Sequence, residues 1–278
     1  MIDIDNVQTI LDNSRRPIEL PAPVPGSKPA WIIPEKFKIE DIEHLLPVPI
    51  RKRANVLMND SDSFIFYTKK HGSLDECTIY ADADFEAQTA TLIGIINDNG
   101  SDPGASSWRD HTATYEPIKT VEWKRWNAFD GKSMPQEDFA NFLEENMSDI
   151  AGNIEGMPTG TDMLAMASEF EATSDKRFKS RINTQGGGVN LLFVDQDNAE
   201  TEQRMRVFER FSLGLRVFLN GQAYRLDARL KYRNSSGKLS FWFELIRPDR
   251  VFEDAVKDEF SKIKTATGFP LLYGSSGK

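Results

Sequence analysis

The segment QAYRLDARLKYR, residues 222–233, alternates charged side chains with apolar or aromatic ones from Tyr224 to Arg233. Successive side chains of a β-strand point to opposite faces of a sheet, so a period of two predicts a strand with one apolar and one charged face. The charged face carries Arg225, Asp227, Arg229, Lys231 and Arg233. We therefore expect an antiparallel sheet with one face in the core and one face in water.

The segments on either side of this strand extend the prediction to a complete sheet and a closing helix. Further strands are expected in RFKSRIN (177–183), VNLLFVD (189–195), MRVFERFSLGLRVFL (205–219) and KLSFWFELI (238–246). Pro248 begins a helix in which apolar residues recur at helical spacing, and Gly268 is its expected C-cap. The apolar positions of that helix are Phe252, Val256, Phe260 and Ile263.

Residues 63–126 show a second β pattern, rich in β-branched and aromatic residues. It comprises SFIFYTKK (63–70), CTIYADADF (77–85), ATLIGIIND (90–98), HTATYEPI (111–118) and TVEWKRW (120–126). A meander of four or five strands is the simplest interpretation, with a hairpin through the polar residues 86–89. Helices are expected at residues 133–147 and 162–172, where apolar side chains recur at helical spacing.

The N-terminal 50 residues hold 8 of the 14 prolines, which predicts an extended arm. The expected fold class is α+β, with two antiparallel sheets, about three main helices and this Pro-rich N-terminal arm. Glycines and a proline near residue 156 favour a division into subdomains at 51–156 and 157–274. Residues 275–278 are expected to be a flexible tail.

Composition and charge exclude several classes of protein. A single cysteine, Cys77, rules out an intrachain disulfide and indicates a reducing compartment, for which the cytoplasm is the expectation. No apolar run approaches the roughly 20 residues of a membrane helix. The formal net charge of −9 argues against a general phosphate-backbone binder, yet residues 175–238 hold 13 Lys and Arg against 7 Asp and Glu. That segment carries a local net charge of +6 and leaves −15 for the rest of the chain.

The cationic strand face at 225–233 is the clearest candidate binding surface. Lys179, Arg181, Arg204 and Arg206 are expected to add neighbouring strands to it. Such a face is typical of sites for nucleic acid or nucleotides, but a solvated face with salt bridges explains the pattern equally well. Trp123 and Trp126 are candidates for stacking on bases, although packing in or near the core is the commoner role of such residues.

Catalytic signatures are lacking in the sequence, which favours a protein without enzymatic activity, cofactor or bound metal. His111 beside Asp110 is a weak candidate for a working pair, and we expect His111 to be a structural residue packed near Trp108. Asp82 and Asp84 share one face of a strand, as metal ligands or an acid/base pair would. Without a third ligand, a solvated strand face is the better explanation.

Six segments together resemble the YfdQ-like family of phage and prophage proteins: WRDHTATY (108–115), TVEWKRW (120–126), FANFLEENMSDI (139–150), RLDARLKYR (225–233), SFWFELIRP (240–248) and TGFPLLYG (267–274). The likeness covers about residues 50–274 and lies in the order and spacing of the segments. The resemblance implies a bacteriophage origin, and with it the cytoplasm of the bacterial host as the location, and it supplies no catalytic residues.

The sequence as a whole favours a non-enzymatic phage accessory protein that self-assembles as a homo-oligomer through its arm and its oppositely charged surfaces. The alternative is a binder of single-stranded nucleic acid or a small nucleotide, in DNA metabolism or as a counter-defence sponge. An enzyme centred on His111, Asp110, Asp82 and Asp84 comes third.

Overall fold

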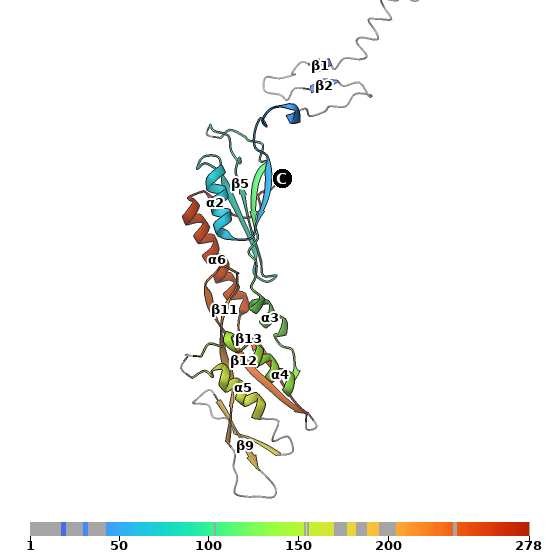
Figure 1. Ribbon diagram of the computed structural model, residues 1–278, viewed down its shortest axis with the longest axis vertical. Helices are drawn as coiled ribbons and strands as arrows, with labels where there is room; N and C mark the ends of the chain where they lie inside the picture. Colours follow the sequence, from blue (N-terminus) through green and yellow to red (C-terminus); the bar gives the residue numbers. More distant parts are fainter. Residues whose placement is uncertain are drawn as a thin grey trace, which may run out of the picture. The chain divides into compact units, whose positions relative to one another are not determined.

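The computed structural model describes the chain in two compact units, residues 1–52 and residues 53–278, each of which is taken by itself. The residues described are 18–20, 30–32, 43–102, 104–152, 154, 156–169, 177–181, 188–194, 204–235 and 238–277 (Figure 1). The side chains of residues 18–20, 30–32, 169–207 and 234–237 lie outside the described part.

The first unit coincides closely with the predicted Pro-rich arm. Within it, strand β1 (Ile18–Leu20) pairs antiparallel with strand β2 (Ala30–Ile32). A single turn of 3-10 helix, η1 (Glu43–Leu45), follows, and the Glu43 carboxylate accepts a hydrogen bond from the backbone N–H of Ile50. Most of the predicted arm lies outside the described residues, so its extended conformation stays a prediction.

The second unit contains a five-stranded sheet with the order β14-β4-β5-β6-β3. Its strands are β3 (Ala54–Met58), β4 (Thr78–Asp84), β5 (Thr89–Ile95), β6 (His111–Tyr115) and β14 (Leu271–Tyr273). The predicted hairpin of β4 and β5 is confirmed, and β6 continues it antiparallel. The expectation of a purely antiparallel meander is wrong at both edges, because β3 pairs parallel with β6 and β14 pairs parallel with β4.

The segment SFIFYTKK, predicted as a strand, instead forms helix α2 (Ser61–His71). Asp60 caps this helix by accepting a hydrogen bond from the backbone N–H of Ser63 at 2.8 Å. Phe64 and Thr68, four residues apart, are buried and lie against Gly94 of β5, where an added Cβ would meet them at 3.2 and 3.1 Å. The spacing of the buried residues is that of a helix, and the β-branched composition misled the prediction.

TVEWKRW was also predicted as a strand and forms helix α3 (Val121–Phe129). Thr120 caps it by accepting a hydrogen bond from the backbone N–H of Trp123. Trp123 and Trp126, three residues apart, face the core together, with exposed fractions of 1% and 0%. Burial of two large aromatic rings on one side outweighs the strand preference of the sequence.

The four-stranded sheet has the order β11-β12-β13-β7, and its three long strands are the ones expected from the alternating segments. It consists of β7 (Met134–Pro135), β11 (Arg210–Arg216), β12 (Ala223–Ser235) and β13 (Lys238–Leu245), all antiparallel. Among the described residues, these five- and four-stranded sheets and five α-helices make a mixed fold, so the predicted fold class is confirmed.

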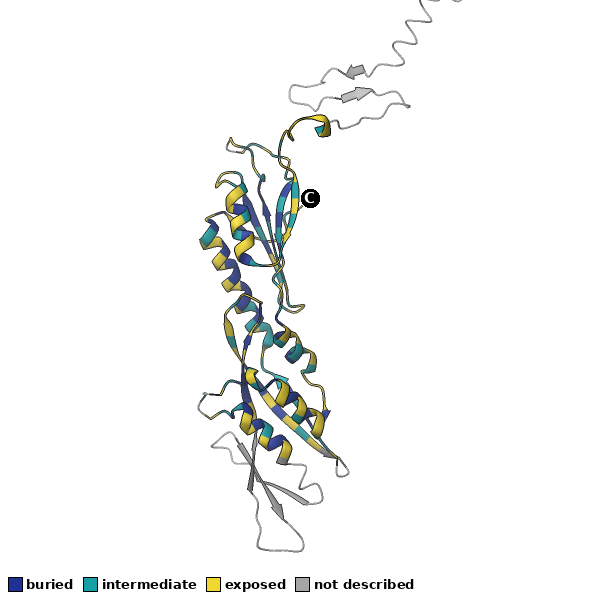
Figure 2. Cartoon of the chain, viewed as in Figure 1, coloured by how far each residue is buried: buried dark blue, intermediate teal, exposed yellow. Residues whose placement is uncertain are grey.

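Helices α4 (Gln136–Glu145) and α5 (Gly160–Glu169) agree with the two helices predicted here, and one turn, η2 (Met147–Asp149), lies between them. The ring of Phe139 stacks on Phe241 of β13 with centroids 5.2 Å apart, and Phe142 stacks on Phe243 at 5.8 Å. Trp126 of α3 packs on Phe243 from the same side. One face of the four-stranded sheet is thus covered by helices, and Figure 2 shows the buried and exposed residues that result.

Helix α6 (Pro248–Thr267) begins at Pro248 and ends at Gly268, which adopts the left-handed conformation with φ 71°, as predicted. Its apolar stripe is buried, and the helix contacts both α2 and β12. After α6 the chain enters β14, so a segment from the predicted second subdomain completes the sheet of the first. The buried apolar residues of both sheets form one continuous core.

A third sheet of three strands has the order β10-β9-β8, formed by β8 (Arg177–Arg181), β9 (Gly188–Val194) and β10 (Arg204–Phe208). Its pairing is antiparallel throughout. These strands were predicted as part of the same sheet as β12, and the structure assigns them to a separate one. The three consecutive glycines at 186–188 predict a hairpin turn between β8 and β9, and these residues lie outside the described part of the chain except for Gly188.

Candidate nucleic-acid interface

The face of the four-stranded sheet opposite the helices is strongly cationic, and we call it the basic face. The register brings its residues together from three strands, because directly paired residues share a face. Its members are Arg210, Ser212, Gly214 and Arg216 of β11, Ala223, Arg225, Asp227, Arg229, Lys231 and Arg233 of β12, and Lys238, Ser240, Trp242 and Glu244 of β13. Seven cations thus stand against two carboxylates.

The basic face is open to solvent around Gly214, whereas Ser212, beside Asp227, is buried. A Cβ added to Gly214 would meet no atom within 4 Å, and Arg225, its cross-strand partner, is exposed. Arg210, Arg216, Arg229 and Arg233 are exposed as well, and within the described part of the chain none of these four forms an ion pair. Their guanidinium groups are therefore available to a ligand.

Two arginines lie directly opposite each other in this face, Arg210 on β11 and Arg229 on β12. Like charges at directly opposed positions of a sheet destabilise it. Glu244 is the cross-strand partner of Arg229 on the other side, but no ion pair joins the two side chains. An anion bound between Arg210 and Arg229 would relieve this repulsion, since the guanidinium group is suited to phosphate and carboxylate oxygens.

Asp227 is the acidic residue at the middle of the basic face, and three contacts hold it there. Arg225 donates to both of its oxygens, from Nε to Oδ1 at 2.7 Å and from Nη2 to Oδ2 at 3.0 Å. Ser212 Oγ donates to Oδ1 at 2.5 Å. Burial raises the pKa of Asp227, but the hydrogen bonds from Arg225 and Ser212 outweigh this and leave the pKa below its usual value. Arg225 is therefore partly neutralised, in contrast to Arg229.

Trp242 is a residue of the basic face that the sequence analysis did not identify. It lies directly opposite Lys231 in the register, and the guanidinium carbon of Arg233 is 5.8 Å from the centroid of its ring. Lys231 itself lies 3.9 Å from Glu244. The alternation in KLSFWFELI carried the signal, because Phe241 and Phe243 are buried in the core and place Trp242 on the opposite face.

The remaining predicted binding residues are not on this surface as described. Lys179 and Arg181 lie on β8, and Arg204 and Arg206 on β10, which are the two edge strands of the three-stranded sheet. The side chains of these four residues are outside the described part of the structure. Of the predicted set, Arg225, Arg229, Lys231 and Arg233 are brought together on β12.

The stacking role considered for Trp123 and Trp126 is wrong, because both rings are buried. Trp123 Nε1 donates to Gln88 Oε1 at 3.0 Å, and Trp126 Nε1 donates to Asp149 Oδ2 at 2.9 Å. Each indole therefore has a hydrogen-bond partner inside the fold, as buried tryptophans usually do.

His111 is 6% exposed on β6, with its Nε2 3.0 Å from the hydroxyl of Tyr67 and its ring 5.5 Å from that of His71. The burial and the hydrogen bond of His111 support the structural role expected for it. The neighbours described above are Tyr67 and His71, whereas Trp108, the expected packing neighbour, is 78% exposed. Asp110 accepts a hydrogen bond from Asn97 Nδ2 and lies 3.8 Å from Arg53 Nε.

Asp82 and Asp84 are exposed on β4, on the side of the sheet away from α2. Asp84 Oδ1 accepts hydrogen bonds from the backbone N–H groups of Glu86 and Ala87, which stabilises the turn into β5. Among the residues whose placement is described, no three His, Cys, Asp or Glu side chains are grouped so that they could hold a metal ion.

A profile of the family described as uncharacterized conserved protein DUF2303 matches residues 5–276. The chain belongs to this family. The DUF2303 match covers almost the whole chain and brings no activity with it. The YfdQ-like kinship and the phage origin stay predictions. No curated protein and no solved structure matches this DUF2303 chain. Across its described residues, no helix combines the length and apolar character needed to cross a membrane.

Proposed function

We propose that this protein binds single-stranded nucleic acid on the basic face, without chemistry of its own. The observation that carries the proposal is the cross-strand pair of Arg210 and Arg229, two exposed arginines held opposite each other, neither of which forms an ion pair with a described residue. A phosphate between them would convert a repulsive pair into two charge-assisted hydrogen bonds.

Single strands fit this face better than duplexes because it combines cations with an accessible aromatic ring. Proteins that bind single strands without sequence preference track the backbone with positive charge and stack bases on aromatic side chains. Arg229, Lys231 and Arg233 follow one another at every second position of β12, about 7 Å apart. Trp242 lies beside them and offers a ring on which a base can stack.

The test is fluorescence anisotropy of a labelled oligo-dT strand, titrated with the protein at a series of salt concentrations. We expect saturable binding whose logarithmic salt dependence has a slope of about −0.7 for each phosphate contacted. Arg229→Glu combined with Arg233→Glu should weaken binding at least tenfold and flatten the slope by about 1.4, the share of two contacts.

A matched control keeps the same change in net charge away from the basic face. Arg250→Glu combined with Lys264→Glu alters two exposed residues of α6 and should leave affinity within about twofold, because screening limits distant charges to about 8 Å at physiological salt. Equal loss in both double variants would mean that net charge alone governs binding. No saturable binding by the unaltered protein would overturn the proposal outright.

Self-assembly is a second candidate, and a different surface favours it. On the face of the five-stranded sheet away from α2, the register aligns Leu57, Thr114, Ile93, Tyr80 and Leu272 in one row across all five strands. Leu57 and Leu272 at its two ends are 59% and 49% exposed. Light scattering behind a sizing column tests this, since a discrete mass above 31.5 kDa indicates an oligomer and a monomer at micromolar concentration contradicts it.

A further inference from the structure

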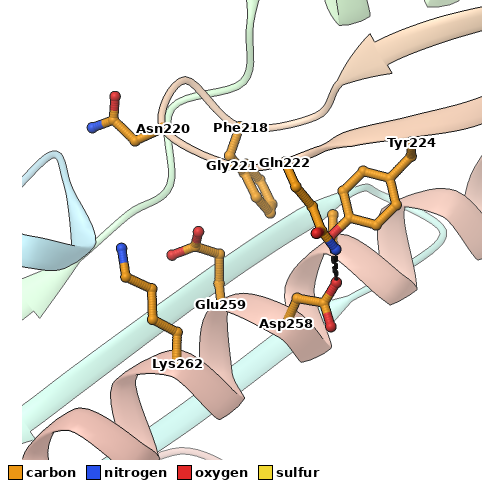
Figure 3. A pocket seen from close by; sticks show the side chains of 9 residues that line it. Phe218, Asn220, Gly221, Gln222, Tyr224, Asp258, Glu259 and Lys262 are labelled. Carbon is orange, nitrogen blue, oxygen red and sulfur yellow. Dashed lines mark hydrogen bonds between the residues drawn. The ribbon is translucent and has the colours of Figure 1, made fainter.

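A pocket of about 300 Å³ lies between α6 and the turn that joins β11 to β12 (Figure 3). The turn contributes Phe218, Asn220 and Gln222, and one side of α6 contributes Ala255, Asp258, Glu259 and Lys262. Tyr224, at the start of β12, closes the pocket beside Asp258. Its volume is at the lower end of the range for small-molecule sites.

Glu259 gives this pocket its chemical character. Glu259 is only 6% exposed. Its Oε2 accepts one hydrogen bond, from the hydroxyl of Tyr115 at 3.2 Å. No described residue donates to Oε1. Because every fully enclosed side-chain oxygen in the described residues has a partner, Oε1 must reach the open space of the pocket. A nearly buried carboxylate with one weak hydrogen bond lacks the partners that such a group normally has.

The other charged groups of the pocket leave it net negative. Asp258 Oδ2 accepts hydrogen bonds from Tyr224 at 2.6 Å and from Gln222 Nε2 at 2.5 Å, which leaves Oδ1 as an acceptor. Burial and the bond to Asp258 raise the pKa of Tyr224 to about 12, so its hydroxyl stays protonated. Lys262 is the one cation of the lining, and it is already held by Asp62 at 2.8 Å and Ser61 Oγ at 2.9 Å.

We propose that this pocket binds a small aliphatic amine, whose ammonium group donates to Glu259 Oε1. The ammonium has three donors and no acceptor, which matches a pocket whose unsatisfied groups are carboxylate oxygens. Phe218 and Ala255 provide an apolar surface for the methylene groups. In a diamine, the second ammonium is placed to meet Asp258, near the mouth of the pocket.

This site is independent of the basic face in both position and sign of charge. The pocket carries carboxylates and selects a cation, whereas the basic face carries arginines and selects an anion. The amine test therefore neither requires nor affects nucleic-acid binding, and failure of either proposal leaves the other standing.

The experiment is isothermal titration of the full-length protein with 1,4-diaminobutane in about 150 mM salt, which suppresses loose attraction to an acidic protein. Butane-1,4-diol has the same length without charge and serves as the ligand control. Saturable binding of the diamine with a stoichiometry near one, and none of the diol, supports the proposal. Equal binding of the two, or no saturable binding of the diamine, overturns it.

Three variants locate the site. Glu259→Gln keeps the shape and the contact with Tyr115 but removes the charge, and should weaken diamine binding tenfold or more. Glu253→Gln, on an exposed turn of the same helix where Lys257 is its partner, is the matched control and should bind like the unaltered protein. Equal affinity in both variants would overturn the proposal.

If Glu259→Gln fails to fold, Asp258→Asn takes its place, because Asp258 is exposed and tolerates substitution better. It should weaken diamine binding several-fold, since it removes the acceptor for the second ammonium. Unchanged affinity in a folded Asp258→Asn protein would then count against the site.

Discussion

The five-stranded and four-stranded sheets are each covered by helices on one face, and they differ in the opposite face. In the five-stranded sheet that face is mostly uncharged, with Asn55, Thr112 and Thr114 among its residues and Asp82 and Asp84 as its charges. In the four-stranded sheet the corresponding face is the basic face.

This difference indicates that contact with water does not by itself require arginines on an open sheet face. A sheet face in water needs side chains that tolerate solvent, and Thr, Asn and Tyr meet that need in the five-stranded sheet. The cations of the basic face repel one another, most strongly where two are directly opposed. Neutral polar residues would avoid this electrostatic cost. The four-stranded sheet therefore has a composition suited to an anionic partner.

The largest expected effect is a difference in the free energy of unfolding between substitutions on the two faces of β13. Phe243→Ala removes a fully buried ring that packs on Phe142 and Trp126, and should lower the free energy of unfolding by about 3–5 kcal/mol. Trp242→Ala, the next residue on the basic face, should cost under about 1 kcal/mol. Urea unfolding of the two variants measures both values. If Trp242→Ala cost as much as Phe243→Ala, the basic face would not be open to solvent.

The next effect concerns the aromatic residue that each open face carries. Trp242→Ala should weaken binding of single-stranded DNA by about 1–3 kcal/mol, the usual contribution of one stacked base. Tyr80→Ala, in the five-stranded sheet, should leave affinity unchanged, because Tyr80 bonds to Asp98 and the one arginine over its ring, Arg109, is itself paired with Asp98. Anisotropy titrations, after circular dichroism has shown both variants to be folded, distinguish these outcomes. Equal losses would place the nucleic acid elsewhere.

The four-stranded sheet was predictable because its signal is local. Alternation along residues 222–233 fixes which side chains share a face, and the structure bears this out from Arg225 to Arg233. The same rule places Trp242 on this face, although only the charged positions were predicted as binding residues. The pairing of Arg210 with Arg229 was beyond reach, since it depends on the register set by the turn at 217–222.

The five-stranded sheet was harder to predict because its decisive contacts are distant in sequence. β14 pairs with β4 across about 190 residues of chain, and no local pattern announces a parallel edge strand. The helices α2 and α3 did carry local signals, in the capping residues Asp60 and Thr120 and in the spacing of Trp123 and Trp126. Strand-like composition concealed them.

A smaller effect of opposite sign tests the repulsion between Arg210 and Arg229. Arg210→Ala should raise the free energy of unfolding by about 0.2–1 kcal/mol, because it removes a like charge directly opposite Arg229. The same substitution should weaken nucleic-acid binding. Arg216→Ala is the control for stability, because Arg216 lies opposite Ala223 and has no such partner. Destabilisation by Arg210→Ala would show that the pair is not under strain.

The smallest effect is the pH dependence contributed by Asp227, the carboxylate that neutralises part of the basic face. Its pKa is lowered in the folded protein, so its contribution to stability is complete above the unfolded value of about 3.9 and is lost as the pH falls through the lowered folded value. Asp227→Asn should therefore destabilise the protein at pH 7, and the difference from the unaltered protein should shrink below about pH 4. Ser212→Ala removes one of the hydrogen bonds that lower the pKa and should give part of the same change. Urea midpoints measured from pH 7 to pH 3 report this difference directly. A difference that stays constant over that range would mean that folding does not lower the pKa of Asp227. The counter-charge of Asp227 would then not be fixed by its contacts with Arg225 and Ser212.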